Sequence, residues 1–502
     1  MLSLAGLTSW DYSVVASGNP IVHLIELLEA FIFSQITLFG VDIEWIVLWM
    51  FAPMAILTVY FGFINLSSFK RAYQILIGRY QDKDAPGEVT QFQALATALS
   101  GTVGLGNIGG VAIAVAIGGP GATLWMIIIG LCAMSLKYAE CTLGVKYRVI
   151  HEDGTVSGGP MYYLKRGLEA RGMSGVGKLL AYSYAGVAVM ALLPQMSQVN
   201  QAYSQISATT GYTGPSSGYV FGIGLAILTG IVIIGGIKSI ANVTSRLVPL
   251  MAFIYVGTAL IILVTHASEI PAAFGIIFTS AFTPEGVEGG IVGAIVIGMR
   301  RAIYSSEAGL GTATIAHSAA RTNEPVSEGM VALMEPFIDT VVICTITALV
   351  IVITGAYTFR GADGELLGDI QMTSAAFGSV ISWFPYVLAG AVMMFAFSTI
   401  ISWGYYSLKV WGFIFGRSPA SELICKLLFC VLVVPGAIMD TSTVIALVDS
   451  LYFTMAIPNI IGIYLMAGEL KRDTKDYLHR LKTGQIPMTN PPKGYQAKAK
   501  KA

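Results

Sequence analysis

Two short glycine-rich breaks interrupt apolar segments of this chain at positions about 205 residues apart. The first reads Ser-Gly-Thr-Val-Gly-Leu-Gly-Asn over residues 100–107, and the second reads Ser-Ser-Glu-Ala-Gly-Leu-Gly over residues 305–311. Both follow the pattern Ser-x-x-x-Gly-Leu-Gly. If these segments lie in hydrocarbon, irregular backbone is tolerated only where protein, water, an ion or a ligand satisfies its amides and carbonyls. The breaks are therefore candidate binding positions.

The composition places the segments in a membrane. Hydrophobic residues make up 55% of the 502 residues and charged residues only 12%, whereas charged residues make up about a quarter of a soluble protein. Apolar runs of about 20 residues recur with little alternation, which favours helices over a β-barrel. The five cysteines lie in or beside apolar segments without metal-ligand spacing, so we expect them to pack. The chain is predicted to be an all-α polytopic membrane protein.

About eleven membrane-spanning segments can be delimited from the apolar runs. They cover residues 44–66, 92–118, 120–147, 179–208, 217–237, 246–265, 289–318, 331–356, 383–408, 424–439 and 441–467. The loops on one side of the membrane carry most of the basic residues, among them Lys70, Arg71, Arg148, Lys238, Arg321 and Lys409. By the positive-inside rule this side is cytoplasmic, so the N-terminus is outside and the C-terminus inside.

The segments divide into two sets of five after the first one. Residues 1–90 would hold the extracellular N-terminus, the extra first helix and a cytoplasmic loop. The repeats would cover 91–268 and 269–468, and 469–502 would form a basic cytoplasmic tail. An odd number of helices per set gives the two sets opposite orientations, and the breaks fall in the first segment of each set. Matching glycine breaks in inverted repeats are typical of the substrate site of a secondary transporter; the alternative is chance recurrence among 56 glycines.

A broken helix offers free backbone groups at both half-helix ends. The N-terminal end suits a carboxylate and the C-terminal end suits a cation. A zwitterionic amino acid together with a metal cation would use both ends, whereas a sugar would not. Asn107, directly after Gly-Leu-Gly, would add a polar side chain to such a site. It could also serve as the N-cap of the second half-helix, which does not exclude the first role.

A second group of polar residues stands in the segment 383–408. Ser398 and Thr399 are adjacent hydroxyls, and Trp403 follows about one turn later. Hard cations prefer oxygen ligands, so two hydroxyls with backbone carbonyls could hold sodium. The alternative is that each hydroxyl bonds to a carbonyl of its own helix.

Two carboxylates lie within apolar segments, where charged side chains are costly enough to suggest function. Glu307 could serve ion coupling, contact a substrate amine or pair with Arg300 or Arg301, and we favour the ion pair because the arginines stand one and two turns away. Asp449 could be an interior hydrogen-bond acceptor. A polar run after Pro194 could line a pocket or join helices: Gln195, Gln198 and Asn200.

Five motifs in order resemble the alanine or glycine:cation symporter family, also called sodium:alanine symporters. They are Gly-Thr-Val-Gly-Leu-Gly-Asn-Ile at 101–108, Gly-Gly-Pro-Gly-Ala at 118–122, Gly-Gly-Pro-Met-Tyr-Tyr-Leu at 158–164, Glu-Ala-Gly-Leu-Gly at 307–311 and Phe-Ser-Thr-Ile-Ile at 397–401. The resemblance covers nearly the whole spanning region. It implies a fold like that of the leucine transporter class, a LeuT-like inverted repeat of five plus five helices with two broken helices.

The resemblance also implies a ligand set. The substrate-binding residues would be Thr102, Gly104, Leu105, Gly106, Asn107, Gln198, Tyr304, Ser305 and Trp403. Backbone groups near Gly104, Leu105 and Gly106 would hold the substrate carboxylate, and carbonyls around Thr102 and Tyr304 would face the amine. The carbonyls of Ser100 and Val103 and the hydroxyls of Ser398 and Thr399 would bind sodium. Trp403 would fill the side-chain pocket and restrict the substrate to the size of alanine or glycine.

Two departures from the family pattern affect this site. The family usually has Phe-Ser-Asn where this chain has Tyr304-Ser305-Ser306, and Phe-Trp-Met-Trp where it has Leu-Trp-Met-Ile at 124–127. The phenolic hydroxyl of Tyr304 could change which small amino acid is preferred. The coupling mechanism is expected to persist because the backbone motif is intact.

The expected function is a sodium-coupled symporter for a small neutral amino acid in the inner cell membrane. The expected partners are the substrate and the lipid bilayer, and no nucleic acid. A proton-coupled carrier using Glu307 or Asp449 and a channel or sensor of the same fold remain alternatives. A membrane-embedded enzyme is disfavoured because the histidines are scattered over termini and loops: His23, His151, His266, His317 and His479.

Overall fold

The computed structural model describes residues 27–490 except 39–40, 83, 193–194, 284–289, 362–363, 365, 368 and 440. The expected extracellular N-terminus, residues 1–26, and the end of the basic tail, residues 491–502, lie outside the described residues.

The first part of the chain forms two small hairpins and most of the first expected repeat. The strands are β1 (Gln35–Leu38) with β2 (Val41–Glu44) and β3 (Val149–Ile150) with β4 (Val156–Ser157), each pair antiparallel. The helices are α2 (Trp45–Tyr60), α3 (Ile64–Ser67), α4 (Phe69–Leu76), α5 (Gln91–Thr102), η2 (Leu105–Asn107), α6 (Gly109–Gly118), α7 (Ala122–Lys146), α8 (Pro160–Glu169), α9 (Ser174–Val189), η3 (Met190–Leu192), α10 (Gln195–Thr210), α11 (Ser217–Ile234) and α12 (Gly236–Thr265).

The second part is helical throughout its described elements. These are α13 (Ile270–Ser280), α14 (Gly290–Ser306), α15 (Ala313–His317), α16 (Pro325–Ala332), α17 (Met334–Pro336), the π-helical η4 (Phe337–Cys344), α18 (Thr345–Ile353), η5 (Ala356–Thr358), α19 (Asp369–Val380), α20 (Phe384–Phe415), α21 (Pro419–Gly436) and α22 (Thr441–Lys482).

The prediction of a helical membrane protein is confirmed, whereas the number of spans stays a prediction. Among the described residues, seven helices are long and apolar enough to cross a membrane, or eight if α5 and α6 count as one bent span. Each of the eleven expected segments coincides with one helix or with a run of consecutive helices. The outer faces of α12 and α21 expose large apolar side chains such as Phe253, Val264 and Val431, which suits contact with lipid.

Several helices begin or end beyond the expected boundaries. α12 begins ten residues before 246 and α16 begins at Pro325, while α22 continues past 467 to Lys482. Charged residues such as Lys238 and Arg480 suggested loops, but helical hydrogen bonds do not stop at the membrane surface. The helical part of the tail is held by Arg480, which makes a bidentate ion pair with Glu324 at 2.6 and 2.8 Å.

Both expected breaks are present. α5 begins with a capping box between Thr90 and Gln93, and α5 and the η2–α6 segment are bent by 67° relative to each other. The second break separates α14 from α15 and contains three residues with left-handed backbone: Glu307 (φ 48°), Gly309 (φ 98°) and Gly311 (φ 77°). A β-carbon on Gly311 would also lie 2.4 Å from the ring of Pro160, so this glycine is required by both conformation and space.

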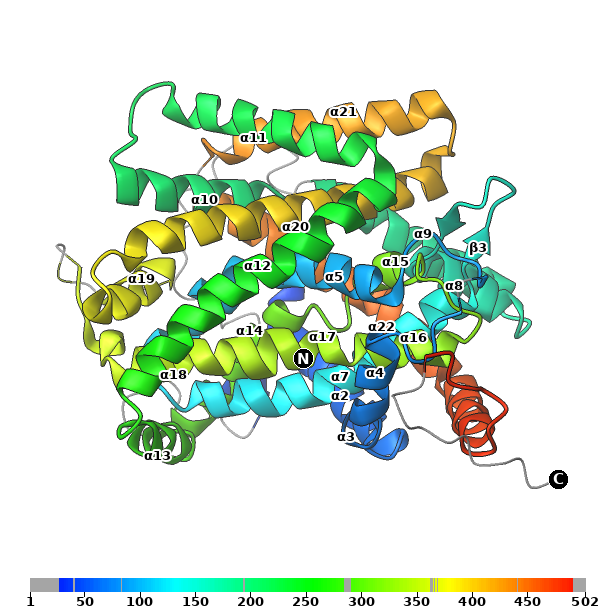
Figure 1. Ribbon diagram of the computed structural model, residues 1–502, viewed down its shortest axis with the longest axis horizontal. Coiled ribbons are helices and arrows are strands. Elements are labelled where there is room, and N and C mark those ends of the chain that lie inside the picture. The colour runs from blue at the N-terminus through cyan, green and yellow to red at the C-terminus, as the bar shows by residue number, and fades with distance from the viewer. Residues whose placement is uncertain are drawn as a thin grey trace.

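The first broken helix lies between two groups of helices. α5 packs against α12 and α20, the long helices that cross near the centre of Figure 1, whereas α6 packs against α14 and α19. α11 and α21 lie side by side along one edge, and α7 packs against α14, α16 and α2. At the break itself, Gly104 faces Gln198 of α10 and Thr399 of α20, and Gly106 faces Tyr304 of α14.

Candidate substrate and ion site

Side-chain hydrogen bonds join α20 to the first broken helix. The Thr399 hydroxyl donates to the Ser100 carbonyl at 2.9 Å, and the Ser100 hydroxyl donates to the Ser398 carbonyl at 2.7 Å. One turn further along, Ser402 donates to the carbonyl of Thr97 at 3.0 Å. All of these side chains are buried. Residues about 300 positions apart in the chain are thus brought together.

The expected sodium ligands differ in the hydrogen bonds that they make. The Ser398 hydroxyl donates to the Phe395 carbonyl of its own helix at 2.9 Å, which is the local alternative. Thr399 instead points across to Ser100. Val103 follows the end of α5, and its amide donates to the Leu99 carbonyl at 2.7 Å. The buried oxygens of Ser100, Ser398 and Thr399 are neutral and close together, and such a donor set suits a hard monovalent cation.

The glycines of the first break let other elements approach its backbone. A β-carbon on Gly104 would lie 3.4 Å from Oγ1 of Thr399 and 3.5 Å from Oε1 of Gln198. A β-carbon on Gly106 would lie 3.5 Å from the ring of Tyr304. The fold therefore places Thr399, Gln198 and Tyr304 around this break. Oε1 of Gln198 has no hydrogen-bond partner among the described residues, as expected of a group that a ligand would satisfy.

The break leaves backbone amides outside regular helix. The last helical hydrogen bond of α5 is made by the Val103 amide, and among the described residues no backbone acceptor is found for the amides of Leu105 and Gly106. The Gly104 amide is different, because it donates to Oδ1 of Asn107 at 2.9 Å. Of the three amides expected to hold a substrate carboxylate, Leu105 and Gly106 are therefore the better placed. Thr102 beside them bonds weakly to Ala98 of its own helix, at 3.4 Å.

Asn107 connects the two breaks. Its Nδ2 donates to the Ser305 hydroxyl at 2.8 Å and to the Asp339 carbonyl at 3.2 Å, and Ser305 contacts the Thr340 hydroxyl at 3.1 Å. The alternative that Asn107 caps the second half-helix is wrong, because the residue that precedes α6 is Ile108 and no side chain caps it. Asn107 and Ser305 are thus part of one buried polar cluster.

Trp403 belongs to an aromatic group that the sequence did not reveal in full. Its ring stacks on Tyr452 with centroids 5.0 Å apart and meets Tyr406 edge-on at 5.6 Å. Tyr452 also lies 6.1 Å from Tyr304. Trp403 is fully buried, and its indole nitrogen has no hydrogen-bond partner among the described residues. Tyr406 could have been suspected from its i+3 spacing on the same helix, whereas Tyr452 comes from α22.

Replacing Trp403 by alanine is expected to admit larger substrates. The lost indole leaves space beside Tyr452, and each methylene accommodated in an apolar pocket changes specificity by roughly tenfold or more. Competition of labelled alanine uptake by larger neutral amino acids measures the effect. Trp411→Ala is the matched control, because Trp411 lies on the same helix but packs on Phe415 and donates to Ser421. An unchanged competition profile in Trp403→Ala would place the indole outside the substrate pocket.

The favoured ion pair between Glu307 and Arg300 or Arg301 is wrong. Arg300 pairs with Glu44 at 3.0 Å, and Arg301 lies near Tyr304 and Asp449. Glu307 lies just after the end of α14, the helix that carries both arginines, and its backbone is left-handed. Its carboxylate accepts from the hydroxyl of Thr312 at 2.8 Å instead.

The other polar residues singled out in the sequence take separate places. Asp449 is buried and interacts with the hydroxyl of Tyr304, so the reading as an interior acceptor holds. Asn200 donates to the Met439 carbonyl at 2.8 Å, which joins helices. The side-chain amide of Gln195 is buried without a hydrogen-bond partner among the described residues.

His317 was expected on a loop, but it is fully buried. Its ring lies between Glu328, at 2.6 Å from Nδ1, and Glu335, at 3.7 Å from Nε2. Lys137 lies 3.2 Å from Glu335 and is also fully buried. Sequence reasoning missed this group because its members are far apart in the chain and stand singly within apolar stretches.

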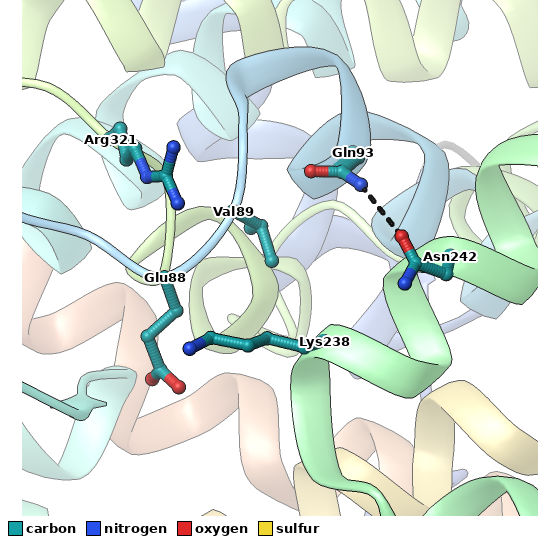
Figure 2. A pocket seen from close by; sticks show the side chains of 6 residues that line it. All are labelled: Glu88, Val89, Gln93, Lys238, Asn242 and Arg321. Carbon is teal, nitrogen blue, oxygen red and sulfur yellow. Dashed lines mark hydrogen bonds between the residues drawn. The ribbon is translucent and has the colours of Figure 1, made fainter. Parts of the chain in front are cut away.

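A polar pocket of about 270 Å³ lies beside the start of α5, away from these residues. Figure 2 shows Lys238 and Glu88 on one side and the hydrogen bond from Gln93 to Asn242, 3.2 Å long, on the other. Val89 and Arg321 complete its lining. None of the expected substrate or sodium ligands lines it.

The chain matches one protein family over most of its length. The family model described as the sodium:alanine symporter family matches residues 27–491. The sodium/alanine symporter AgcS of Methanococcus maripaludis is 37% identical over 84% of this chain and 91% of its own length. The putative sodium/proton-dependent alanine carrier protein YrbD of Bacillus subtilis is 36% identical over 83% of this chain and 87% of its own length.

A solved structure shows the same fold at lower sequence identity. MhsT, crystallised in complex with L-phenylalanine, aligns with a TM-score of 0.54 and 16% identity over 76% of this chain and 90% of its own. This likeness establishes the LeuT-like fold.

Proposed function

Because the chain belongs to the sodium:alanine symporter family, we propose that it uses a sodium gradient to import a small neutral amino acid such as alanine or glycine. At the coarser level, it is a multi-pass membrane protein and a cation-coupled amino-acid symporter, not an enzyme. Sodium as the coupling ion and a small neutral substrate are the finer parts of the proposal.

The observation that carries the proposal is the convergence of two kinds of groups on the first break. The amides of Leu105 and Gly106 suit the substrate carboxylate, and Asn107, Ser305, Thr102 and Tyr304 lie around them. On the opposite side, the oxygens of Ser100, Ser398 and Thr399 suit sodium, with Val103 as a further carbonyl ligand. The unpartnered Oε1 of Gln198 faces the same glycine as Thr399.

The proposed sodium site supports coupling for a mechanical reason. Its ligands come from α5 and α20, which are joined through the contact between Thr399 and Ser100. An ion bound between them stabilises the arrangement in which they touch, so its occupancy shifts the population of conformational states. If substrate binding at Leu105 and Gly106 requires the same arrangement, each ligand strengthens the binding of the other.

The proposed substrate size rests on the aromatic group. The buried rings of Trp403 and Tyr452 and the ring of Tyr304 limit the space beside the first break.

In the membrane we place the N-terminus outside and the C-terminus in the cytoplasm. The reason is that most of the basic loops lie on one side of the membrane, and Glu269 lies on the opposite side. The polar pocket beside the start of α5 then lies at the cytoplasmic end.

Uptake into proteoliposomes tests the proposal. We expect an inward sodium gradient to drive labelled alanine or glycine above its equilibrium concentration, whereas an equal potassium gradient does not. An empty-vesicle control corrects for leakage. Accumulation driven by a pH gradient without sodium would favour a proton-coupled carrier, and uptake that never exceeds equilibrium would favour a channel or sensor.

A further inference from the structure

A buried cluster of charged residues adjoins the second break. It contains five carboxyl groups and two bases that are at most 5% exposed. The bases are Lys137 on α7 and His317 on α15. The carboxyl groups are Glu140 on α7, Glu307 in the second break, Glu328 on α16, Glu335 on α17 and Asp339 on η4.

Among these carboxyl groups, the ion pairs of the two bases involve only Glu328 and Glu335, although Lys137 also acts at longer range on Glu140 and Glu307. His317 contacts Glu328 and Glu335, and Lys137 lies 3.2 Å from Glu335. Arg148 is the next cation near Glu328, and its guanidinium donates to four carbonyls at 2.6–2.8 Å. Two bases and this arginine cannot neutralise five carboxylates.

The remaining three carboxyl groups accept only from neutral donors among the described hydrogen bonds. Glu140 accepts from the Gly309 amide at 3.0 Å and from Nδ2 of Asn459 at 2.6 Å. Glu307 accepts from a threonine hydroxyl, as does Asp339. The other oxygens of Glu140 and Asp339 are buried without a hydrogen-bond partner among the described residues. Burial of a carboxylate that has no ion pair of its own is costly, and this cost favours binding of a proton.

We propose that this cluster is a proton-binding site, and that Glu140 gains and loses its proton as the transporter changes conformation. The inference rests on the proposed transport function. It adds a second ligand, the proton, at a place distinct from the sodium ligands on α20. The described carboxylates and histidine do not group closely enough to hold a metal ion. We therefore infer that a proton neutralises the excess negative charge of the carboxyl groups.

The position of Glu140 connects its proton to movement. Asn459 donates to Glu140 and to the Gly309 carbonyl, and it accepts from the hydroxyl of Tyr163. Glu140 is thereby tied to the second break, to α22 and to α8. Any conformational step that moves the break relative to α7 removes donors from this carboxyl group and changes its preference for the proton. Glu307, the first residue of the break, has left-handed backbone that costs energy outside glycine.

The other titratable groups that face the cluster are weak acids. They are Cys141 on α7, Tyr163 on α8, Tyr184 on α9, Tyr304 on α14, Cys344 on η4, Tyr406 on α20 and Tyr452 on α22. Tyr184 donates to the Leu310 carbonyl at 2.9 Å, beside the break. None of these groups supplies a positive charge.

Glu140→Gln tests the proposal because glutamine keeps the shape and the acceptor oxygen but cannot ionise. Sodium-driven alanine uptake is measured from acid to alkaline pH at a fixed sodium gradient. We expect the wild-type rate to change about fivefold or more, roughly 1 kcal/mol of coupling. Glu140→Gln is expected to keep the acid-side rate of the wild type at every pH. Glu324→Gln, which removes a carboxylate outside the cluster, should retain the wild-type profile.

Infrared difference spectroscopy of the purified protein supplies a readout that does not depend on transport. The wild type is expected to lose a protonated-carboxyl band on going from acid to alkaline pH, and Glu140→Gln should lack this change. If Glu140→Gln does not fold, Asn459→Ala replaces it and should move the midpoint of the band to higher pH. A pH-independent wild type, or an unaltered band in the variants, would overturn the proton site. If sodium does not drive uptake but the wild-type band still changes with pH, only the proposed function is overturned.

Discussion

Replacing Thr399 by valine is expected to raise the sodium concentration for half-maximal alanine uptake about tenfold or more. Valine keeps the shape of threonine but removes the hydroxyl that bridges α20 and the carbonyl of Ser100 at 2.9 Å. If this oxygen binds sodium, the variant loses a ligand and leaves the carbonyl of Ser100 without its donor. A tenfold change corresponds to about 1.4 kcal/mol. Ser398→Ala should have a smaller effect, because its hydroxyl donates within its own helix.

The measurement is uptake as a function of sodium at a fixed substrate concentration. Thr229→Val is the matched control, because Thr229 is fully buried on α11 and its hydroxyl has no partner among the described residues. The control should leave the sodium dependence unchanged. Wild-type sodium dependence in Thr399→Val would remove this hydroxyl from the ion site.

Replacing Asn107 by alanine is expected to reduce uptake to background and to lower the thermal unfolding midpoint. The side chain is fully buried and bonds to the amide of Gly104, the hydroxyl of Ser305 and the carbonyl of Asp339. Each buried group left unpaired costs about 1–3 kcal/mol. Since Asn107 is the link between the two breaks, its loss also releases the backbone that we expect to hold the substrate carboxylate.

Fluorescence-detected thermal unfolding and uptake in proteoliposomes together separate the two effects. Asn65→Ala is the matched control, since Asn65 is buried and donates to the carbonyl of Leu131 at 2.7 Å, and neither residue belongs to a break. It should lower stability without abolishing uptake. If Asn107→Ala transports at the wild-type rate, the contact between the breaks is not needed for transport.

Much of the architecture could be predicted because the membrane imposes it locally. A bilayer demands apolar runs of a fixed length, so helices such as α7 and α11 fall close to their expected boundaries. The breaks could be predicted because glycine is required where the backbone leaves the helix, as at Gly309 and Gly311. Helix ends beyond the apolar region could not be predicted, because hydropathy does not indicate where a charged helical segment such as the end of α22 stops.

The candidate site was predicted in part. Thr399, Gln198, Tyr304 and Ser305 do converge on the first break, as the family resemblance implied. The partners of Glu307 were not predicted correctly, because spacing along one helix suggested Arg300 and Arg301 while the break turns the carboxylate away from them. The charge network around Lys137 was missed altogether, since each member stands alone in its apolar stretch.

The sequence by itself determined that the chain is a helical membrane protein with two broken helices, and its motifs pointed to the family. These features follow from composition and from local backbone requirements. The tertiary structure alone decided that Asn107 joins the two breaks, that Tyr452 stacks on Trp403 and that five carboxyl groups share two bases. Such contacts depend on side chains that are up to about 300 residues apart in the chain. Burial makes their hydrogen bonds and charges energetically decisive. Neither the burial of these side chains nor their pairing can be deduced from the order of the residues.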